Sequence, residues 1–188
     1  MPILRAIPRS RQRDEPWANG AGSTTVILRE PDEADWRVRV SIARVDRDGP
    51  FSELPGTRRT LIPLDAPMTL RFPDGRELTG ACFDTLQFDG SPAPAGLLPQ
   101  GPTRDFNLML RGDARGEAMA QILRHPTPLP LTAGTRWLVY LDNGHALLGA
   151  DDGQALALNP HDAALVIPEG GPARVEGTGE IILVKLYA

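Results

Sequence analysis

Cysteine is nearly absent from this sequence of 188 residues, in which Cys82 is the only one. A single cysteine forms no internal disulfide and offers no pair for zinc, so a reducing cytoplasm is the expected location. Long hydrophobic runs are also missing, because no stretch approaches the roughly 20 apolar residues that cross a bilayer. The Arg-rich first 15 residues contain no apolar core of the kind that a secretory signal carries.

The sequence also lacks a strong excess of charge of one sign. It has 20 Lys and Arg against 24 Asp and Glu, which gives a formal net charge of −4 at pH 7. A mildly acidic chain without a basic run is a poor match for the phosphate backbone of nucleic acids. We therefore expect neither nucleic acid nor a membrane as a partner.

Turn-forming residues, by contrast, are abundant, with 19 glycines and 19 prolines. Residues 36–42 alternate large apolar and polar side chains, which is the period-two pattern of a half-buried strand. Further short apolar segments are residues 24–28, 60–64, 68–72 and 106–110. Short strands separated by Gly/Pro turns predict an all-β sandwich or barrel. A short helix is expected only near residues 32–35.

The second half of the chain repeats this pattern. Residues 136–141 read as a strand, and the Asp-Asn-Gly at 142–144 predicts a hairpin turn into a returning strand. Residues 88–103 read as a long irregular surface connection. We predict two β modules, residues 1–112 and residues 113–188, which share an interface and form one compact unit.

Several kinds of reactive site are not expected. The metal site common in β-barrels of this kind needs two histidines two residues apart on a strand, a nearby carboxylate and a later histidine, whereas the three histidines here, His125, His145 and His161, are widely spaced. Cys82 has no neighbouring His or Lys that would activate it, and the sequence has no Gly-x-Ser-x-Gly motif. The glycines at 20–22 precede a strand rather than a helix, which disfavours a dinucleotide site. We expect no metal and no cofactor.

Two polar segments each allow two interpretations. Trp17 and Asn19 stand before a glycine pair at a strand entry, where the glycines form either a structural turn or a close approach to a ligand. Arg59 either begins a strand at the surface or points into the barrel. A buried guanidinium needs an acidic partner or an anionic ligand, so the second case predicts a binding site.

A third polar segment is residues 104–111. Its alternation places Asp105, Asn107 and Met109 on one face of a strand and apolar side chains on the other. The polar face either is exposed to solvent or lines a pocket. An Arg59–Asp105 pair with Asn107 beside it would form one polar wall of such a pocket.

Together these segments resemble the HutD/Ves family. The resemblance rests on residues 16–22, 36–43, 48–52, 55–59 and 105–109, in the family's order and spacing. The chain departs from the family pattern at Ala18, where a lysine is usual, at Ala21, where a glycine is usual, and at Arg58, where an aspartate is usual. These departures change the charge around the expected pocket.

The resemblance implies a cupin-type double-stranded β-helix (jelly roll) with two cupin modules and no metal-binding histidine set. It also implies a link to histidine utilisation, with binding of urocanate, a formylated derivative or a similar small carboxylate in a regulatory role. We expect Arg59 to pair with the carboxylate and Asn19 and Asn107 to bond its polar atoms. The remaining expected site residues are Trp17, Phe83 and Met109 as apolar walls, Ser41 as a hydroxyl donor, and Asp105.

Two other functions stay open at this point. A metal-free isomerase, epimerase or lyase would need a general acid or base, for which the candidates are Asp105, Glu53 and His145. A structural or interaction protein with a vestigial pocket is the other possibility. Exposed edge strands would support a homodimer in any of these cases.

Overall fold

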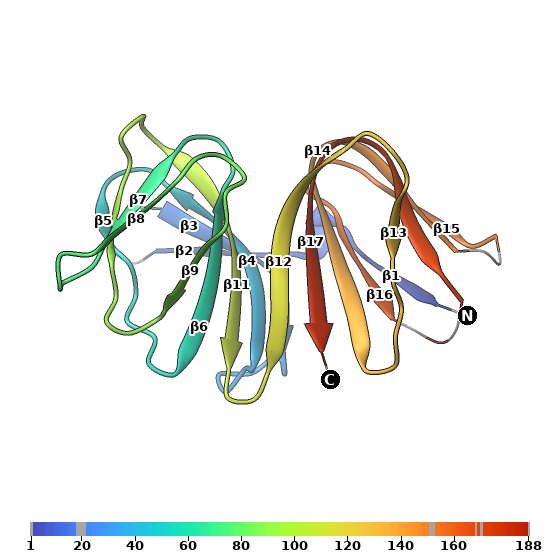
Figure 1. Ribbon diagram of the computed structural model, residues 1–188, viewed down its shortest axis with the longest axis horizontal. Helices are drawn as coiled ribbons and strands as arrows, with labels where there is room; N and C mark the ends of the chain where they lie inside the picture. Colours follow the sequence, from blue (N-terminus) through green and yellow to red (C-terminus); the bar gives the residue numbers. More distant parts are fainter. Residues whose placement is uncertain (1, 18–21, 151–152, 168, 170, 188) are drawn as a thin grey trace. The chain divides into compact units, whose positions relative to one another are not determined.

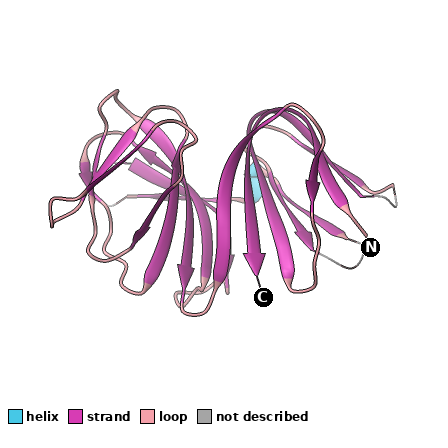
Figure 2. Ribbon diagram, in the orientation of Figure 1, coloured by secondary structure: helices cyan, strands magenta, loops and turns pink. Residues whose placement is uncertain are grey.

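The computed structural model describes residues 2–17, 22–150, 153–167, 169 and 171–187. Within these ranges the regular structure is β-sheet, apart from one turn of 3-10 helix, η1 (Arg9–Arg11) (Figures 1 and 2). No helix in the described ranges is long and apolar enough to cross a membrane. Residues 32–35, where a short helix was expected, form turns instead.

The chain divides into two compact units. Unit 1 consists of Met1–Gln12 and Arg115–Ala188, and unit 2 consists of Arg13–Ala114. The sequence-based boundary gave all of residues 1–112 to the first module. In the structure the first segment belongs to unit 1, because β1 (Ile3–Ile7) pairs antiparallel with β16 (Ala163–Ile167).

Unit 2 contains two antiparallel sheets. The larger has the strand order β2-β3-β4-β11-β6-β9 and the smaller the order β5-β10-β7-β8. Their bounds are β2 (Arg13–Pro16), β3 (Gly22–Glu30), β4 (Val38–Val45), β5 (Gly49–Pro50), β6 (Thr57–Pro63), β7 (Met68–Arg71), β8 (Glu77–Gly80), β9 (Leu86–Asp89), β10 (Ala95–Leu97) and β11 (Thr103–Arg111).

The apolar core of unit 2 draws residues from both of its sheets. It includes Leu61, Met68, Leu70, Phe72 and Phe88. The segment 88–103, expected to be irregular, contains the end of β9 and all of β10. β9 brings Phe88 into the core of unit 2, and β10 joins β5 to β7 in the smaller sheet.

Unit 1 forms one seven-stranded sheet with the path β1-β16-β14-β17-β12, in which β13 also pairs with β17 and β15 with β14. The bounds of its other strands are β12 (Arg115–Leu123), β13 (Thr127–Leu129), β14 (Thr135–Ala150), β15 (Ala155–Leu158) and β17 (Ala173–Tyr187). Its interior is apolar and includes Leu141, Leu148, Val166, Val175 and Ile181.

The hairpin turn expected at residues 142–144 is wrong. Strand β14 continues through this segment, with a register irregularity between Leu141 and Asn143. Gly144 (φ 89°) lies opposite Gly179 (φ 128°), and both strands stay paired beyond this point. The register makes Asp142 the extra residue of β14, and such a bulge lets a strand change direction without ending, so the Asn-Gly sequence here follows a bulge and does not form a turn.

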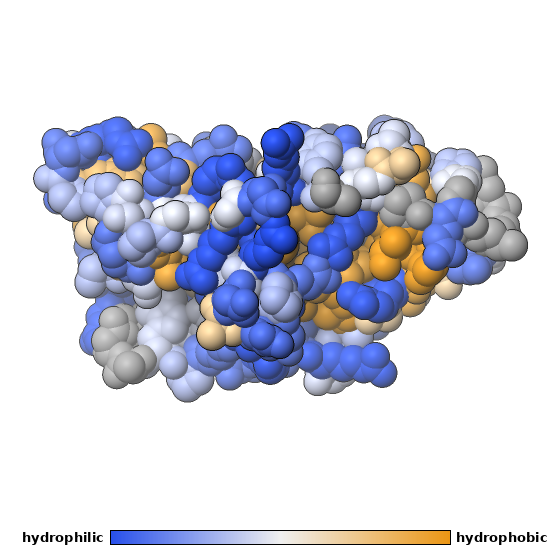
Figure 3. Space-filling view, turned by 90° about the horizontal axis from the view of Figure 1, so that it is seen from below, coloured by the Kyte–Doolittle hydropathy of each residue, from blue (hydrophilic) through white to orange (hydrophobic). Residues whose placement is uncertain are grey.

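Hydrophobic side chains also reach the surface of unit 1. Figure 3 shows orange residues on one face of the molecule among blue hydrophilic ones. Large apolar residues of unit 1 that are more than one third exposed are Ile3, Met119, Ile122 and Leu147. Unit 2, by contrast, buries polar side chains, and these define the candidate site.

Candidate functional site

Three central strands of the larger sheet of unit 2 bring polar side chains to one face. In the register of β4, β11 and β6, Met109 lies between Arg39 and Arg59, and Asn107 lies opposite Ser41. Side chains two residues apart on a strand share a face, so Asn107 and Met109 point the same way. The result is a row of two arginines flanking a methionine, with an amide and a hydroxyl in the next row.

This face lines a cavity of about 400 Å³. Such a volume suits a small organic molecule. Its lining residues are Trp17, Thr24, Arg39, Ser41, Ala43, Pro50, Phe51, Ser52, Leu54, Arg59, Asn107 and Met109. The indole Nε1 of Trp17 donates a hydrogen bond to Thr24 Oγ1 at 2.8 Å, which fixes the orientation of the ring at the wall.

Arg59 is the most buried cation of the cavity, with 4% of its surface exposed. Its Cζ lies 5.0 Å from the ring centroids of both Phe51 and Phe88, within cation–π range. Its Nη2 donates to Asn107 Oδ1 at 2.9 Å, while its Nε has no hydrogen-bond partner in the described part of the chain. Burial lowers the pKa of Arg59 to about 10, partly opposed by the charge of Asp105, so the guanidinium stays charged at neutral pH.

Asp105 lies behind Asn107 and is fully buried. Its Oδ1 accepts a short hydrogen bond from Asn107 Nδ2, and its Oδ2 has no partner among the described residues. Burial raises the pKa of Asp105 to about 7, against the opposing effects of Arg59 and of the Asn107 hydrogen bond. Asn107 therefore links a buried carboxyl group to a buried guanidinium.

The raised pKa of Asp105 predicts a pH dependence of stability. The folded state holds this proton up to about pH 7, whereas an unfolded aspartate loses it near pH 4. The free energy of unfolding should therefore fall as pH rises from about 4 to 7, by at most about 1.4 kcal/mol per pH unit from this group.

Chemical denaturation at several pH values, on the native protein and on Asp105→Asn, measures this contribution. The native protein should lose stability relative to the variant as pH increases through that window, because the variant lacks the titrating group. A constant difference between the two proteins from pH 4 to 8 would contradict the shift.

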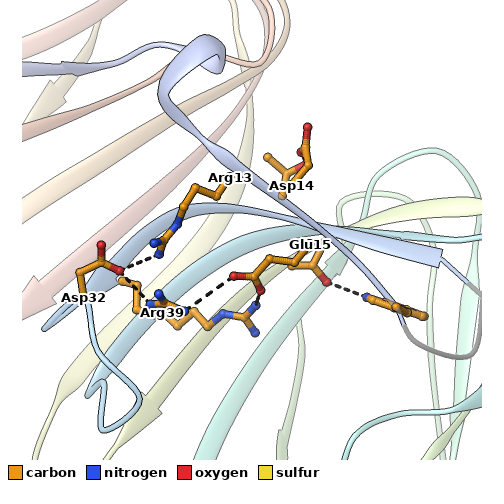
Figure 4. Close-up of polar contacts among 9 residues, drawn as sticks. Arg13, Asp14, Glu15, Asp32 and Arg39 are labelled. Carbon is orange, nitrogen blue, oxygen red and sulfur yellow. Dashed lines mark hydrogen bonds and ion pairs between the residues drawn. The ribbon is translucent and has the colours of Figure 1, made fainter.

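Arg39, the second cation of the cavity, is held by an ion-pair network on β2 to β4 (Figure 4). Its Nη2 lies 3.1 Å from Glu15 Oε2, and Arg29 Nη1 lies 3.7 Å from the other oxygen of Glu15. Arg29 and Arg13 both bond Asp32, at 2.9 and 2.6 Å. Glu15 therefore balances the charge of Arg39 within the protein, whereas the Nε of Arg59 faces no hydrogen-bonding group in the described residues.

The structure brings most of the residues expected from the sequence together. Those that line the cavity are Trp17, Ser41, Arg59, Asn107 and Met109. Asp105 hydrogen-bonds Asn107 but does not line the cavity, and Asn19 lies outside the described residues.

Phe83 is placed differently from the other expected residues. It follows β8 with φ 69°, its backbone N–H donates to the carbonyl of Pro63, and it is not among the residues that line the cavity. The aromatic rings that contact Arg59 are those of Phe51 and Phe88. Phe51, in the loop after β5, lines the cavity, whereas Phe88 of edge strand β9 packs against Arg59 without being part of the lining.

Arg39 is a charged lining residue of the cavity that sequence reasoning missed. The alternation of residues 36–42 puts it on the same face as Ser41, which was expected in the site, so the signal was present. Phe51 stands in a segment on which the family resemblance rests, but no periodic pattern indicates where its ring points.

The other candidate acids and bases lie apart from the cavity lining. Glu53 accepts a hydrogen bond from the backbone N–H of Ala93, and His145, in unit 1, lies 3.3 Å from Thr178 Oγ1 through its Nδ1. Asp105, the remaining candidate, has no exposed surface. Within the described ranges no group of three or more His, Cys, Asp or Glu side chains is arranged to hold a metal ion.

Solved structures with the same fold cover essentially the whole chain. A conserved protein of unknown function from Pseudomonas aeruginosa PAO1, PA5104, is 24% identical with a TM-score of 0.88, over 99% of this chain and 100% of its own. HutD from Pseudomonas fluorescens SBW25 is 25% identical with a TM-score of 0.79, over 98% of each chain. A cupin 2 conserved barrel domain protein from Leptotrichia buccalis is 13% identical with a TM-score of 0.55, over 88% of each chain. The comparison with curated proteins gave no match.

The two β units and these matches define an all-β protein of the cupin class, with a polar pocket in unit 2, which confirms the expected fold. Residues 9–183 match the HutD family. The chain therefore belongs to the HutD family, as the sequence resemblance implied, and this membership links it to histidine utilisation.

Proposed function

We propose that the pocket of unit 2 binds a small carboxylate of histidine breakdown, such as urocanate, and that the protein acts as a regulatory binding protein in that pathway. The observation that carries the proposal is the buried charge of Arg59. Arg59 is 4% exposed, lies at the cavity wall, and has an Nε without a hydrogen-bond partner among the described residues. A buried cation of this kind is stabilised by an anion that brings its own hydrogen-bond acceptors.

The rest of the lining suits a planar ligand that carries a carboxylate at one end. Phe51, Trp17 and Met109 supply apolar and aromatic surface, while Ser41 and Asn107 supply polar atoms. Pockets for small molecules combine an apolar lining with a few placed polar groups in this way. The cavity of about 400 Å³ is large enough for a molecule of the size of urocanate.

Titration calorimetry of the native protein with urocanate tests the proposal. We expect saturable binding of one urocanate per chain, and binding at least about tenfold weaker for the methyl ester, which lacks the negative charge that Arg59 would pair with. Formate is a useful second probe, because the HutD structure from P. fluorescens is described for a formate condition. No binding of urocanate or formate, or equal binding of urocanate and its ester, would contradict the proposal.

A regulatory role further implies that urocanate leaves the pocket unchanged. Its ultraviolet absorbance should stay constant during prolonged incubation with the protein. A loss of absorbance that Asp105→Asn abolishes would instead support the isomerase, epimerase or lyase alternative.

A further inference from the structure

We propose that carboxylate binding at Arg59 is coupled to the uptake of a proton by Asp105, so that the pocket takes up an anion and a proton together. This inference rests on the proposed function, since it requires a carboxylate in the cavity of unit 2. It adds a linkage between two groups, of which only Arg59 reaches the ligand.

Three side chains form the physical connection. Asn107 accepts a hydrogen bond from Arg59 Nη2 through its Oδ1 and donates through its Nδ2 to Asp105 Oδ1. Asp105 is fully buried, and its Oδ2 has no hydrogen-bond partner among the described residues. The free oxygen can carry a proton without breaking the bond to Asn107, because that bond uses the other oxygen.

A bound carboxylate changes the electrostatic balance at this connection. In the pocket without ligand, the positive charge of Arg59 favours the ionised form of Asp105. A ligand carboxylate on the same guanidinium places a second negative charge nearby, in a region of low polarity where charges interact strongly. Like charges that share one site raise the pKa of the group that can still accept a proton, which here is Asp105.

The other charged side chains near Asp105 lie on β4 and on β11. On β4, Arg39 shares the face of Asp105 and is paired with Glu15 of β2. On β11, Arg111 stacks on the ring of Trp36, with its Cζ 3.7 Å from the ring centroid. Arg39 is thus balanced by a carboxylate of the protein, and Arg59 is the cation that Asp105 and the ligand share.

The neighbours of Asp105 and Arg59 along their own strands point to the opposite face, because side chains alternate. Arg104 there forms an ion pair with Asp65 at 2.6 Å, and Arg58 donates to the carbonyl of Ala114. Both groups therefore have partners away from the pocket.

The size of the coupling follows from the pKa of about 7 for Asp105 in the pocket without ligand. At pH 7 the carboxyl group is about half protonated, so each bound carboxylate should bring about half a proton. The uptake should approach zero at pH 6 and rise toward one proton at pH 8. The affinity should accordingly fall with increasing pH, by up to about tenfold per pH unit above pH 7.

Calorimetry with formate in buffers of different ionisation enthalpy measures the protons directly. Formate is fully ionised from pH 6 to 8, so any proton taken up in this range belongs to the protein. We expect the uptake to increase from pH 6 to 8 in the native protein and to disappear in Asp105→Asn. The amide oxygen introduced by this substitution can still accept the hydrogen bond from Asn107 Nδ2. Asp46→Asn, which removes an exposed carboxylate paired with Arg44, is the matched control and should behave as the native protein does.

The outcomes of this experiment distinguish failure of the proton linkage from failure of the proposed function. If formate binds but no proton is taken up at pH 6, 7 or 8, the linkage is overturned and the proposed function stands. Uptake that persists in Asp105→Asn overturns the assignment to Asp105. If neither formate nor urocanate binds, both the linkage and the proposed function fail. The pH series on the native protein decides the linkage even if the variant does not fold.

Discussion

Arg59→Ala is expected to weaken the binding of urocanate by about 30- to 1000-fold. The substitution removes a buried charge-assisted contact, and loss of one partner of such a contact costs roughly 2–4 kcal/mol, with tenfold in affinity for every 1.4 kcal/mol. The loss should be large because the guanidinium is held in place before the ligand arrives. Phe51, Phe88 and Asn107 fix its position, so little ordering is needed on binding.

The matched control for this experiment is Arg44→Ala. Arg44 lies on β4 of the same sheet but is exposed and paired with Asp46, at 2.8 Å. Surface ion pairs contribute little to stability, so this variant should fold and bind urocanate as the native protein does. Circular dichroism should first establish that Arg59→Ala retains its sheet structure. Equal affinity of the folded Arg59→Ala variant and the native protein would refute the proposed role of Arg59.

Gly144→Ala should destabilise unit 1 by about 3 kcal/mol or more. A Cβ at this position would lie 2.0 Å from the carbonyl oxygen of Thr178, and the φ of 89° disfavours any residue with a side chain. Neither the backbone of β14 nor that of β17 can retreat without losing the pairing that continues on both sides of the glycine. Thermal unfolding followed by calorimetry should show a strongly lowered transition or no folded protein.

Gly153→Ala separates the effect of the close contact from the effect of the positive φ. Gly153 also belongs to unit 1 and has a φ of 86°, but a Cβ there would meet no atom of the described residues within 4 Å. Its substitution should cost only about 1–2 kcal/mol, the penalty of the backbone conformation alone. Similar losses in the two variants would mean that the close approach of β14 and β17 at Gly144 is unimportant.

The polar face of unit 2 could be predicted because strand alternation is a local property. Once residues 104–111 and the segment leading into Arg59 were assigned as strands, the positions of Asn107 and Met109 on one face followed from the chain itself. Whether the side chain of Arg59 points into the barrel or toward solvent could not be predicted from the neighbouring sequence. It depends on Phe51 and Phe88, which the folded chain brings to the guanidinium from separate segments.

The differences between the structure and the sequence-based expectations have the same origin. An Asn-Gly sequence fits a hairpin turn and a bulge equally well, and only the partner strand, here β17 with Gly179, decides between them. Residues 88–103 look irregular because β10 has three residues and gains its structure from pairing with β5 and β7. The pairing of β1 with β16 joins segments more than 150 residues apart, and no pattern within either strand announces it.

That last pairing sets an order for folding during synthesis on the ribosome. Unit 2 is continuous in the chain and is complete once Ala114 has been translated, whereas β1 must wait for β16 before it has a partner. All strands of unit 2 are therefore available for pairing before the partner of β1 has been synthesised. Unit 1 can complete its sheet only after β16 and the strands that pair with it have left the ribosomal exit tunnel.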